Sequence, residues 1–263
     1  MNVSYPSIGI GFDERTKLLS VDGDVRTPDV RYLNQMNSVL YDKQFAMEAD
    51  PRLELYYMYK DVTKKNDRPM FEANELRFDI TIMSERRLGK EFNKTLGHVH
   101  EAGPSGFYYP ELYEVISGRA HYLLQQMQDG DPSRVVLVEA REGERVLIPP
   151  GWWHFTINPS NEPLVMSDLV WRGVVVDYGP IRRRTGAAYF ELHDGSLVRN
   201  SSYERVPELT RARASPELGE RTAGNRSLYS SFVESPETYR YLWHPEDFQS
   251  MWRSPPGHSG VSS

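Results

Sequence analysis

Two histidines separated by a single residue and followed by a glutamate form a pattern that could bind a metal ion. Residues 97–115 read GHVHEAGPSGFYYPELYEV, with His98 and His100 before a loop rich in Gly and Pro and Glu111 after it. Side chains at i and i+2 of a strand point to the same face, so His98 and His100 can reach one ion from one strand. Glu111 could return on the neighbouring antiparallel strand. These residues are either ordinary polar residues of a strand or three ligands that need a fourth.

A second stretch suggests the fourth. Residues 143–158 read GERVLIPPGWWHFTIN, whose Gly, Pro, Gly, His and Asn are spaced as in the second conserved box of the cupin superfamily. The first cupin box, His-x-His followed by a Glu, resembles His98, His100 and Glu111, with a longer spacer before the Glu. The resemblance implies that His98, His100, Glu111 and His154 are metal ligands. Three imidazoles and one carboxylate suit one divalent transition ion (Fe, Mn, Ni, Co or Zn) better than Ca or Mg.

Other polar residues do not share this setting. The chain contains no cysteine, which excludes disulfides, thiolate ligands and cysteine nucleophiles. Glu114 lies three residues after Glu111, so on a strand it points to the opposite face, and we leave it out of the site. We expect the remaining histidines to be surface or core residues: His121, His193, His244 and His258.

The elements that must position these ligands are short and strand-like. The segments are rich in Val, Ile, Tyr and Trp, are separated by Gly, Pro and Asn, and cover 53–62, 76–84, 113–127, 134–140, 144–150, 155–158 and 163–175. This pattern predicts an antiparallel all-β sandwich or barrel. Asp194-Gly195 between two strand-like runs predicts a hairpin over 189–202. The cupin resemblance makes the expected fold a double-stranded β-helix, that is, a jelly-roll barrel.

The two ends of the chain differ in composition from the strand-like middle. We expect an N-terminal extension over 1–44, the cupin barrel over 45–207 and a C-terminal extension over 208–263. A helix is expected over 30–49, after a Thr-Pro-Asp start signal at 27–29. The polar stretch 208–227 is expected to be helix or loop, and 253–263 a disordered tail. Aromatic residues of the extension should pack on the barrel or on a second subunit: Tyr229, Phe232, Tyr239, Tyr241, Trp243 and Phe248.

Length and composition narrow the function classes. The chain has 263 residues, of which 39% are hydrophobic and 12% aromatic, enough for a sizeable core. A net charge of -6 and a pI near 5.7 disfavour nucleic-acid binding. The N-terminus shows no signal-peptide pattern, and no run approaches the roughly 20 apolar residues of a membrane span. We therefore expect a cytoplasmic enzyme or binding protein that contacts neither nucleic acid nor membrane.

A narrower resemblance suggests a reaction. The stretches TIMSERRLGKEFNKTLGHVH, PELYEVISGRAHYLLQ, PPGWWHFTIN and DYGPI, spread between about residues 45 and 207, resemble the cupin-type phosphoglucose isomerases of archaea and some bacteria. The resemblance implies aldose–ketose isomerisation of glucose 6-phosphate and fructose 6-phosphate, a step of glycolysis and gluconeogenesis. It also implies a set of substrate-binding residues, of which the first three would hold the phosphate: Thr81, Thr95, Gly97, Tyr113 and Tyr178.

The resemblance gives Glu111 a second role. The hard step is the removal of a weakly acidic proton beside a carbonyl, and Glu111 would move this proton between C2 and C1 while the metal stabilises the enediolate. A hydride shift is a competing mechanism.

Three other interpretations stay open at this point. The chain could be an isomerase or epimerase of another sugar phosphate, a cupin oxygenase, or a non-enzymatic sugar-phosphate sensor. By analogy with other cupins, we expect a homodimer.

Overall fold

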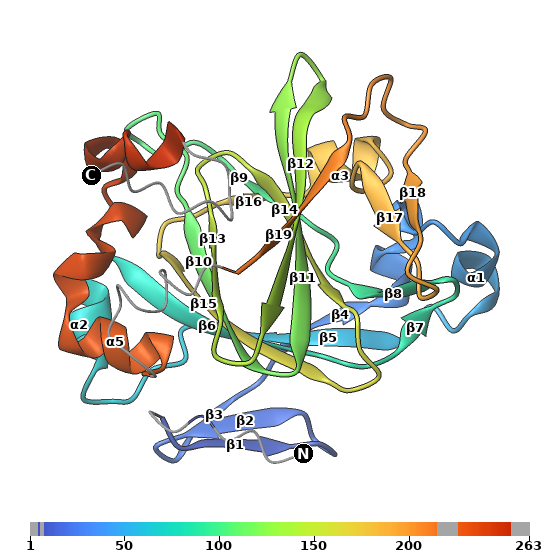
Figure 1. The fold of residues 1–263 in the computed structure, drawn as a ribbon. Helices are drawn as coiled ribbons and strands as arrows, with labels where there is room; N and C mark the ends of the chain where they lie inside the picture. Colours follow the sequence, from blue (N-terminus) through green and yellow to red (C-terminus); the bar gives the residue numbers. More distant parts are fainter. Residues whose placement is uncertain (1–4, 6–7, 215–225, 254–263) are drawn as a thin grey trace.

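Two six-stranded sheets pack face to face and form the body of the molecule (Figure 1). This computed structural model describes residues 5, 8–214 and 226–253. In spatial order, the first sheet contains β13 (Arg145–Ile148), β10 (Glu111–Ser117), β15 (Leu164–Trp171), β6 (Leu76–Met83), β5 (Glu54–Tyr59) and β4 (Asp29–Tyr32). The second contains β19 (Leu209–Arg213), β12 (Asp131–Arg141), β11 (Arg119–Gln128), β14 (Trp153–Asn158), β8 (Glu91–Lys94) and β7 (Arg87–Leu88).

The chain crosses repeatedly between the two sheets. β10 lies in the first sheet, β11 and β12 in the second, β13 in the first, β14 in the second and β15 in the first. All ladders in these sheets are antiparallel except β12 with β19. The first crossing turns at Gly118, whose φ is +92°, and a Cβ there would lie 2.9 Å from the carbonyl oxygen of Pro163. This connectivity confirms the expected all-β jelly-roll barrel.

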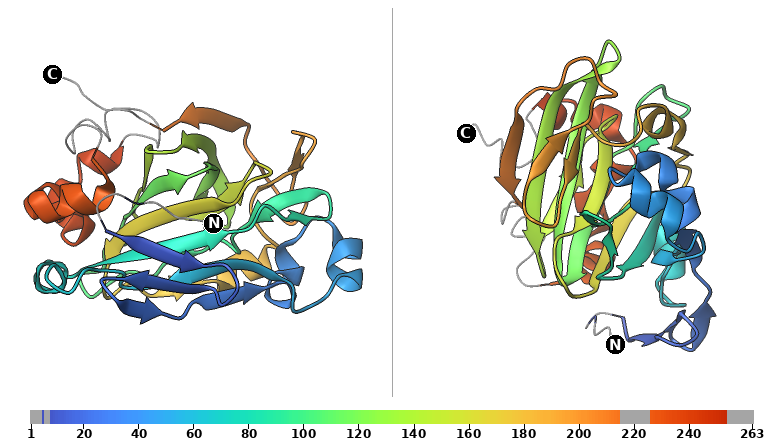
Figure 2. Two further views of the ribbon diagram at one scale, coloured as in Figure 1. Left: turned by 90° about the horizontal axis from the view of Figure 1, so that it is seen from below. Right: turned by 90° about the vertical axis from the view of Figure 1, so that its right-hand side faces the viewer.

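Smaller elements surround the barrel (Figure 2). The short strands are β1 (Ile10–Asp13), β2 (Leu18–Val21), β3 (Asp24–Arg26), β9 (Val99–His100), β16 (Val176–Asp177), β17 (Tyr189–Glu191) and β18 (Leu197–Arg199). The α-helices are α1 (Lys43–Glu48), α2 (Arg68–Ala73), α3 (Gly179–Arg183) and α5 (Leu228–Glu234). The 3₁₀ helices are η1 (Leu33–Gln35), η2 (Asn37–Val39), η3 (Pro236–Leu242), η4 (Pro245–Phe248) and η5 (Met251–Arg253). β17 and β18 form the hairpin predicted from Asp194-Gly195.

The prediction of one helix over 30–49 is wrong. Its first residues belong to β4, which pairs with β5, and they are followed by η1, η2 and the short helix α1. Backbone pairing with a neighbouring strand overrides the local helix propensity of this segment. The Thr-Pro-Asp signal at 27–29 precedes a strand, which is compatible with Pro because the residue before a proline prefers extended backbone. The correction matters because β4 contributes a side chain to the cavity described below.

The polar stretch 208–227 also differs from expectation, because its beginning forms β19 parallel to β12. This segment forms a strand because the distant β12 is its partner, and its polar sequence does not indicate that pairing. The disordered tail expected over 253–263 lies, apart from Arg253 at the end of η5, outside the described residues. The boundaries at 44 and 207 remain predictions, and strands from both flanks join the two large sheets.

The aromatic residues of the C-terminal extension pack on the outer face of the first sheet, as predicted. The four side chains of this set that are fully buried are Tyr229, Phe232, Tyr239 and Tyr241. They share a core cluster with Phe78 of β6, Leu112 of β10 and Val165 of β15, and Trp243 and Phe248 pack against it partly buried. None of the helices in the described ranges is long and apolar enough to cross a membrane.

Glu114 connects this extension to the barrel. Its carboxylate accepts hydrogen bonds from the Leu228 amide at the start of α5, from Arg145 of β13 and from the Tyr5 hydroxyl. Glu114 therefore faces away from the barrel interior, as its spacing from Glu111 predicts.

Candidate metal centre

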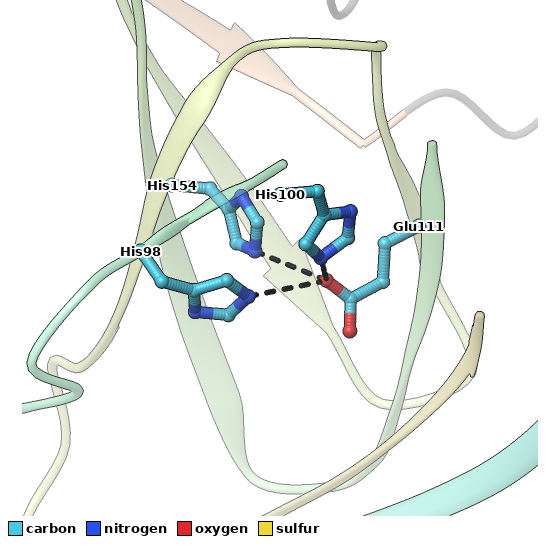
Figure 3. A group of neighbouring side chains, drawn as sticks. All are labelled: His98, His100, Glu111 and His154. Carbon is cyan, nitrogen blue, oxygen red and sulfur yellow. Dashed lines mark ion pairs between the residues drawn. The ribbon is translucent and has the colours of Figure 1, made fainter. Parts of the chain in front are cut away.

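The four predicted ligands converge inside the barrel. The ligand atoms of His98, His100, Glu111 and His154 all lie within 4.8 Å of one another. One carboxylate oxygen, Glu111 Oε2, lies 3.0 Å from His154 Nε2, 3.3 Å from His100 Nε2 and 3.7 Å from His98 Nε2 (Figure 3). No other described histidine joins this group, and His258 lies outside the described residues.

Backbone pairing holds two of the histidines opposite each other. His98 and His154 form an isolated antiparallel bridge in which each backbone N–H donates to the other residue's carbonyl, at 3.1 and 3.0 Å. His100 follows two residues later on β9, whose partner is Val176 of β16. The rings of His98 and His100 are 5.3 Å apart, so the two histidines reach the same point, as their spacing predicts.

We had expected Glu111 on the strand next to the histidines, but it lies elsewhere. β9 pairs with β16, whereas Glu111 begins β10 of the first sheet, paired with Ile148 and Val170. The spacer folds into a small loop closed by a bridge between Ala102 and Tyr108, and this loop carries the chain across to the first sheet. The carboxylate thus reaches the imidazoles from another sheet, a long-range arrangement that residue spacing cannot reveal.

The hydrogen bonds of the outer ring nitrogens favour a metal at the centre. His100 Nδ1 lies 2.8 Å from the carbonyl oxygen of Tyr109, and His154 Nδ1 lies 3.2 Å from that of Trp152. A carbonyl only accepts, so Nδ1 donates in both rings, and in the neutral form of each ring Nε2 keeps a lone pair for a metal. Both Glu111 Oε2 and His154 Nε2 are buried without a hydrogen-bond partner among the described residues. Lone pairs that face each other at 3.0 Å need a cation between them.

The protonation states also fit metal binding. Burial alone would raise the pKa of Glu111, but its contacts with His100, His154 and His98 lower that pKa well below its ordinary value. Burial, with His154 and His100 adding to it and Glu111 opposing it, lowers the pKa of His98 to about 3. At neutral pH the group therefore offers a carboxylate and a neutral imidazole, the forms that bind metals.

The predicted substrate residues line the same cavity as the ligands. This cavity has a volume of about 620 Å³, and the predicted residues along it are Thr81, Thr95, Gly97, Tyr113 and Tyr178. The Tyr113 ring lies 6.1 Å from the His154 ring, and the Tyr178 ring 6.0 Å from the His98 ring. Burial and the charge of Glu111 raise the pKa of Tyr113, which keeps its hydroxyl protonated.

Gly97 could not be another residue here. Its φ is +77°, and a Cβ would lie 2.0 Å from the ring of Phe155. Its N–H makes no hydrogen bond within the described part of the chain. Two residues earlier, Thr95 Oγ1 accepts from the Thr156 N–H at 2.9 Å, which leaves the hydroxyl proton available to another acceptor.

Several residues that line the cavity were not predicted from the sequence. Arg31 and Tyr56 come from β4 and β5, and Arg77, Asp79 and Asp168 come from β6 and β15. Arg77 Nε donates to Asp79 at 2.8 Å. Burial, with the charges of Glu111 and Asp79 adding to it and Arg77 opposing it, raises the pKa of Asp168 well above its ordinary value. An aspartate in the middle of a mostly apolar strand was the available signal for Asp79 and Asp168.

The geometry agrees with the comparison against known families. The glucose-6-phosphate isomerase (GPI) family model matches residues 30–208, which is more than half of the chain and includes all four ligands. The chain belongs to the glucose-6-phosphate isomerase family. The family match begins within β4, so it includes Arg31 as well as the barrel predicted over 45–207.

Individual relatives carry the same family name. A glucose-6-phosphate isomerase of Thermococcus litoralis is 28% identical over 173 residues, which cover 64% of this chain and 83% of that protein. A glucose-6-phosphate isomerase of Pyrococcus furiosus is 28% identical over 159 residues, which cover 59% of this chain and 76% of that protein. Among solved structures, an oxalate oxidase aligns with a TM-score of 0.32 at 14% identity, over 55% of this chain and 54% of its own.

Proposed function

We propose that this protein interconverts glucose 6-phosphate and fructose 6-phosphate with the help of one divalent transition ion. The observation that carries the proposal is the group of three imidazoles and one carboxylate within 4.8 Å, set in a cavity of a chain that belongs to the glucose-6-phosphate isomerase family. We propose Fe, Mn, Ni, Co or Zn as the ion, because nitrogen-rich ligand sets suit these metals.

Each group of residues in the cavity has its own role in the proposed reaction. An ion held by His98, His100, Glu111 and His154 would supply a Lewis acid for the charge that develops on the sugar oxygens. Glu111 is the carboxylate that lies among the three imidazoles, so it would also serve as the proton carrier between C1 and C2 of the sugar. The Tyr113 hydroxyl, on the same strand and the same face as Glu111, is positioned to donate a hydrogen bond to a sugar oxygen.

The phosphate group would bind away from the metal. Thr81 Oγ1, Thr95 Oγ1 and the Gly97 N–H are donors of residues that line the cavity, and hydroxyl and backbone N–H groups are suitable phosphate partners. Tyr178 lies beside His98 and would close the cavity over the sugar. This arrangement leaves the reacting carbons at the metal and the phosphate at the threonines.

The setting of the enzyme follows from this activity. We propose a cytoplasmic protein of glycolysis and gluconeogenesis whose partner is its sugar-phosphate substrate. We propose a homodimer, because an open barrel presents sheet edges that a second copy can cover. Sedimentation equilibrium measures this directly, and a monomer at micromolar concentration would contradict it.

A coupled assay tests the activity. Fructose 6-phosphate is supplied, and the glucose 6-phosphate formed is oxidised by an added NADP-dependent dehydrogenase. We expect turnover in protein loaded with a transition ion, loss of turnover after chelation and recovery when the ion is returned. Absence of turnover with every one of the five ions, in protein shown to be folded and metal-loaded, would contradict the proposal.

A further inference from the structure

Arg31 is a buried cation of the cavity that has no carboxylate partner among the residues that the structure describes. It lies on β4, is only 9% exposed and lines the same cavity as the metal ligands. Its recorded hydrogen bond, from Nη2 to the Tyr178 hydroxyl, measures 3.3 Å, and Nε is buried without any partner in the described residues. The carboxylate on the same strand, Asp29, pairs instead with Lys60 at 3.0 Å.

Two other arginines, Arg77 within β6 and Arg172 directly after β15, show the contrast. Arg77 pairs with Asp79 at 2.8 Å, and Arg172 pairs with Asp61 at 2.8 Å. A buried ion normally has such a partner, because burying an uncompensated charge costs several kcal/mol. The arrangement at Arg31 is therefore incomplete without an anion.

Two tyrosine rings fix the guanidinium. The Arg31 Cζ atom lies 5.8 Å from the centre of the Tyr56 ring and 5.1 Å from that of Tyr178. Burial would lower the pKa of Arg31, and contacts with the two tyrosines raise it above its ordinary value, so the group stays charged. Held between two rings, the guanidinium is oriented before any ligand arrives, which reduces the entropy lost on binding.

The position of Arg31 matches one end of a sugar phosphate. Tyr178 contacts Arg31 on one side and lies 6.0 Å from the His98 ring on the other, so one ring separates the cation from the metal centre. On its other side, the Tyr56 hydroxyl accepts a hydrogen bond from the Leu96 N–H at 3.1 Å, between Thr95 and Gly97. Arg31 thus stands next to the segment that carries the neutral phosphate donors.

We propose that Arg31 binds the phosphate group of the substrate and supplies its counter-charge. This inference rests on the proposed function and adds the one thing that Thr81, Thr95 and Gly97 lack, a positive charge. A guanidinium offers two parallel N–H groups that match two phosphate oxygens, so it selects a phosphomonoester dianion over an uncharged sugar. The first sheet thereby supplies a specificity residue from a strand that precedes the predicted barrel.

Calorimetric titration with inorganic phosphate tests the inference without any turnover. We expect Arg31→Gln to weaken phosphate binding by about tenfold to a hundredfold, the usual effect of losing a charged hydrogen-bonding partner. Arg31→Lys keeps the charge but loses the two parallel N–H groups of the guanidinium. Its phosphate affinity should therefore lie between those of the wild type and Arg31→Gln. Arg240→Gln removes a positive charge from an exposed pair with Asp247 and should bind phosphate like the wild type.

Thermal unfolding of the same proteins separates binding from folding. Phosphate should raise the Tm of the wild type, because a ligand of the native state stabilises it, and should not raise that of Arg31→Gln. Without phosphate the Arg31→Gln protein should melt at or above the wild-type temperature, since an uncompensated buried charge has been removed. If Arg31→Gln does not fold, Arg31→Met takes its place, because it also removes the charge, and wild-type phosphate affinity in either neutral variant would overturn the inference.

Kinetics distinguishes the two proposals. For an active isomerase, Arg31→Gln should raise the KM for glucose 6-phosphate by a similar factor and lower kcat less. An active enzyme whose phosphate affinity does not depend on Arg31 refutes the inference and leaves the proposed function standing. A protein that binds phosphate through Arg31 but isomerises no sugar phosphate refutes the function and supports the inference.

Discussion

Strand β10 carries two glutamates with opposite tasks, and replacing each by glutamine should separate catalysis from stability. Glu111 faces the cavity and lies within 3.7 Å of three imidazoles. Glu114 faces the C-terminal extension and accepts two hydrogen bonds of 2.9 Å from the Leu228 amide and one of 3.2 Å from Arg145. Glutamine keeps the volume of the side chain in both cases but removes its charge and its basicity.

For Glu114→Gln the expected loss is one of stability. Breaking a buried ion pair costs about 3–5 kcal/mol, mainly because the other charge stays buried. Arg145 keeps two further acceptors, the Arg226 carbonyl and the Ser231 hydroxyl, so we expect a loss near the lower limit, about 3 kcal/mol of the free energy of unfolding. Activity per folded molecule should be unchanged, because Glu114 does not line the cavity.

For Glu111→Gln the expected loss is one of catalysis. The three imidazoles remain, so the protein should keep its metal, while kcat should fall by about 10²–10⁴, the contribution of a positioned acid–base group.

Urea unfolding, elemental analysis and the coupled assay on both variants measure the three quantities. A Glu111→Gln protein that retains metal and isomerises normally would refute its role as proton carrier and would favour a hydride shift. A Glu114→Gln protein as stable as the wild type would refute the role of Glu114 in holding the extension.

Three other outcomes are expected. His154→Ala should lose metal affinity first and regain part of its activity with excess ion, as read from metal titration beside kcat; normal metal affinity would contradict its role as a ligand. Thr81→Val and Thr95→Val should each weaken binding of glucose 6-phosphate by about 1–3 kcal/mol, measured as KM with free glucose as the comparison substrate. Equal effects on glucose would assign these hydroxyls to packing. Gly97→Ala should destabilise the protein by more than about 1 kcal/mol in urea, because of its positive φ and the ring of Phe155, and an unchanged protein would contradict this.

Local sequence was enough to predict that two of the histidines share one face and that the fold is all-β. His98 and His100 are two residues apart, and a strand period of two brings them together wherever the strand lies. The alternating apolar residues of the strands are likewise a local signal, so the all-β class could be predicted. Glu111 and His154 joined the predicted ligand set through the resemblance to the two cupin boxes. Asp194-Gly195 predicted its hairpin for the same reason.

The pairing of strands that lie far apart in the chain could not be predicted from local sequence. Glu111 reaches the histidines from the facing sheet, because β10 pairs with β13 and β15 and not with β9. Arg31 enters the cavity because its segment, which has the composition of a helix, pairs with β5 as an edge strand. Local sequence sets the period of a strand, but its partners are chosen by which apolar faces can be buried together across long distances in the chain, and that choice is made by the whole fold.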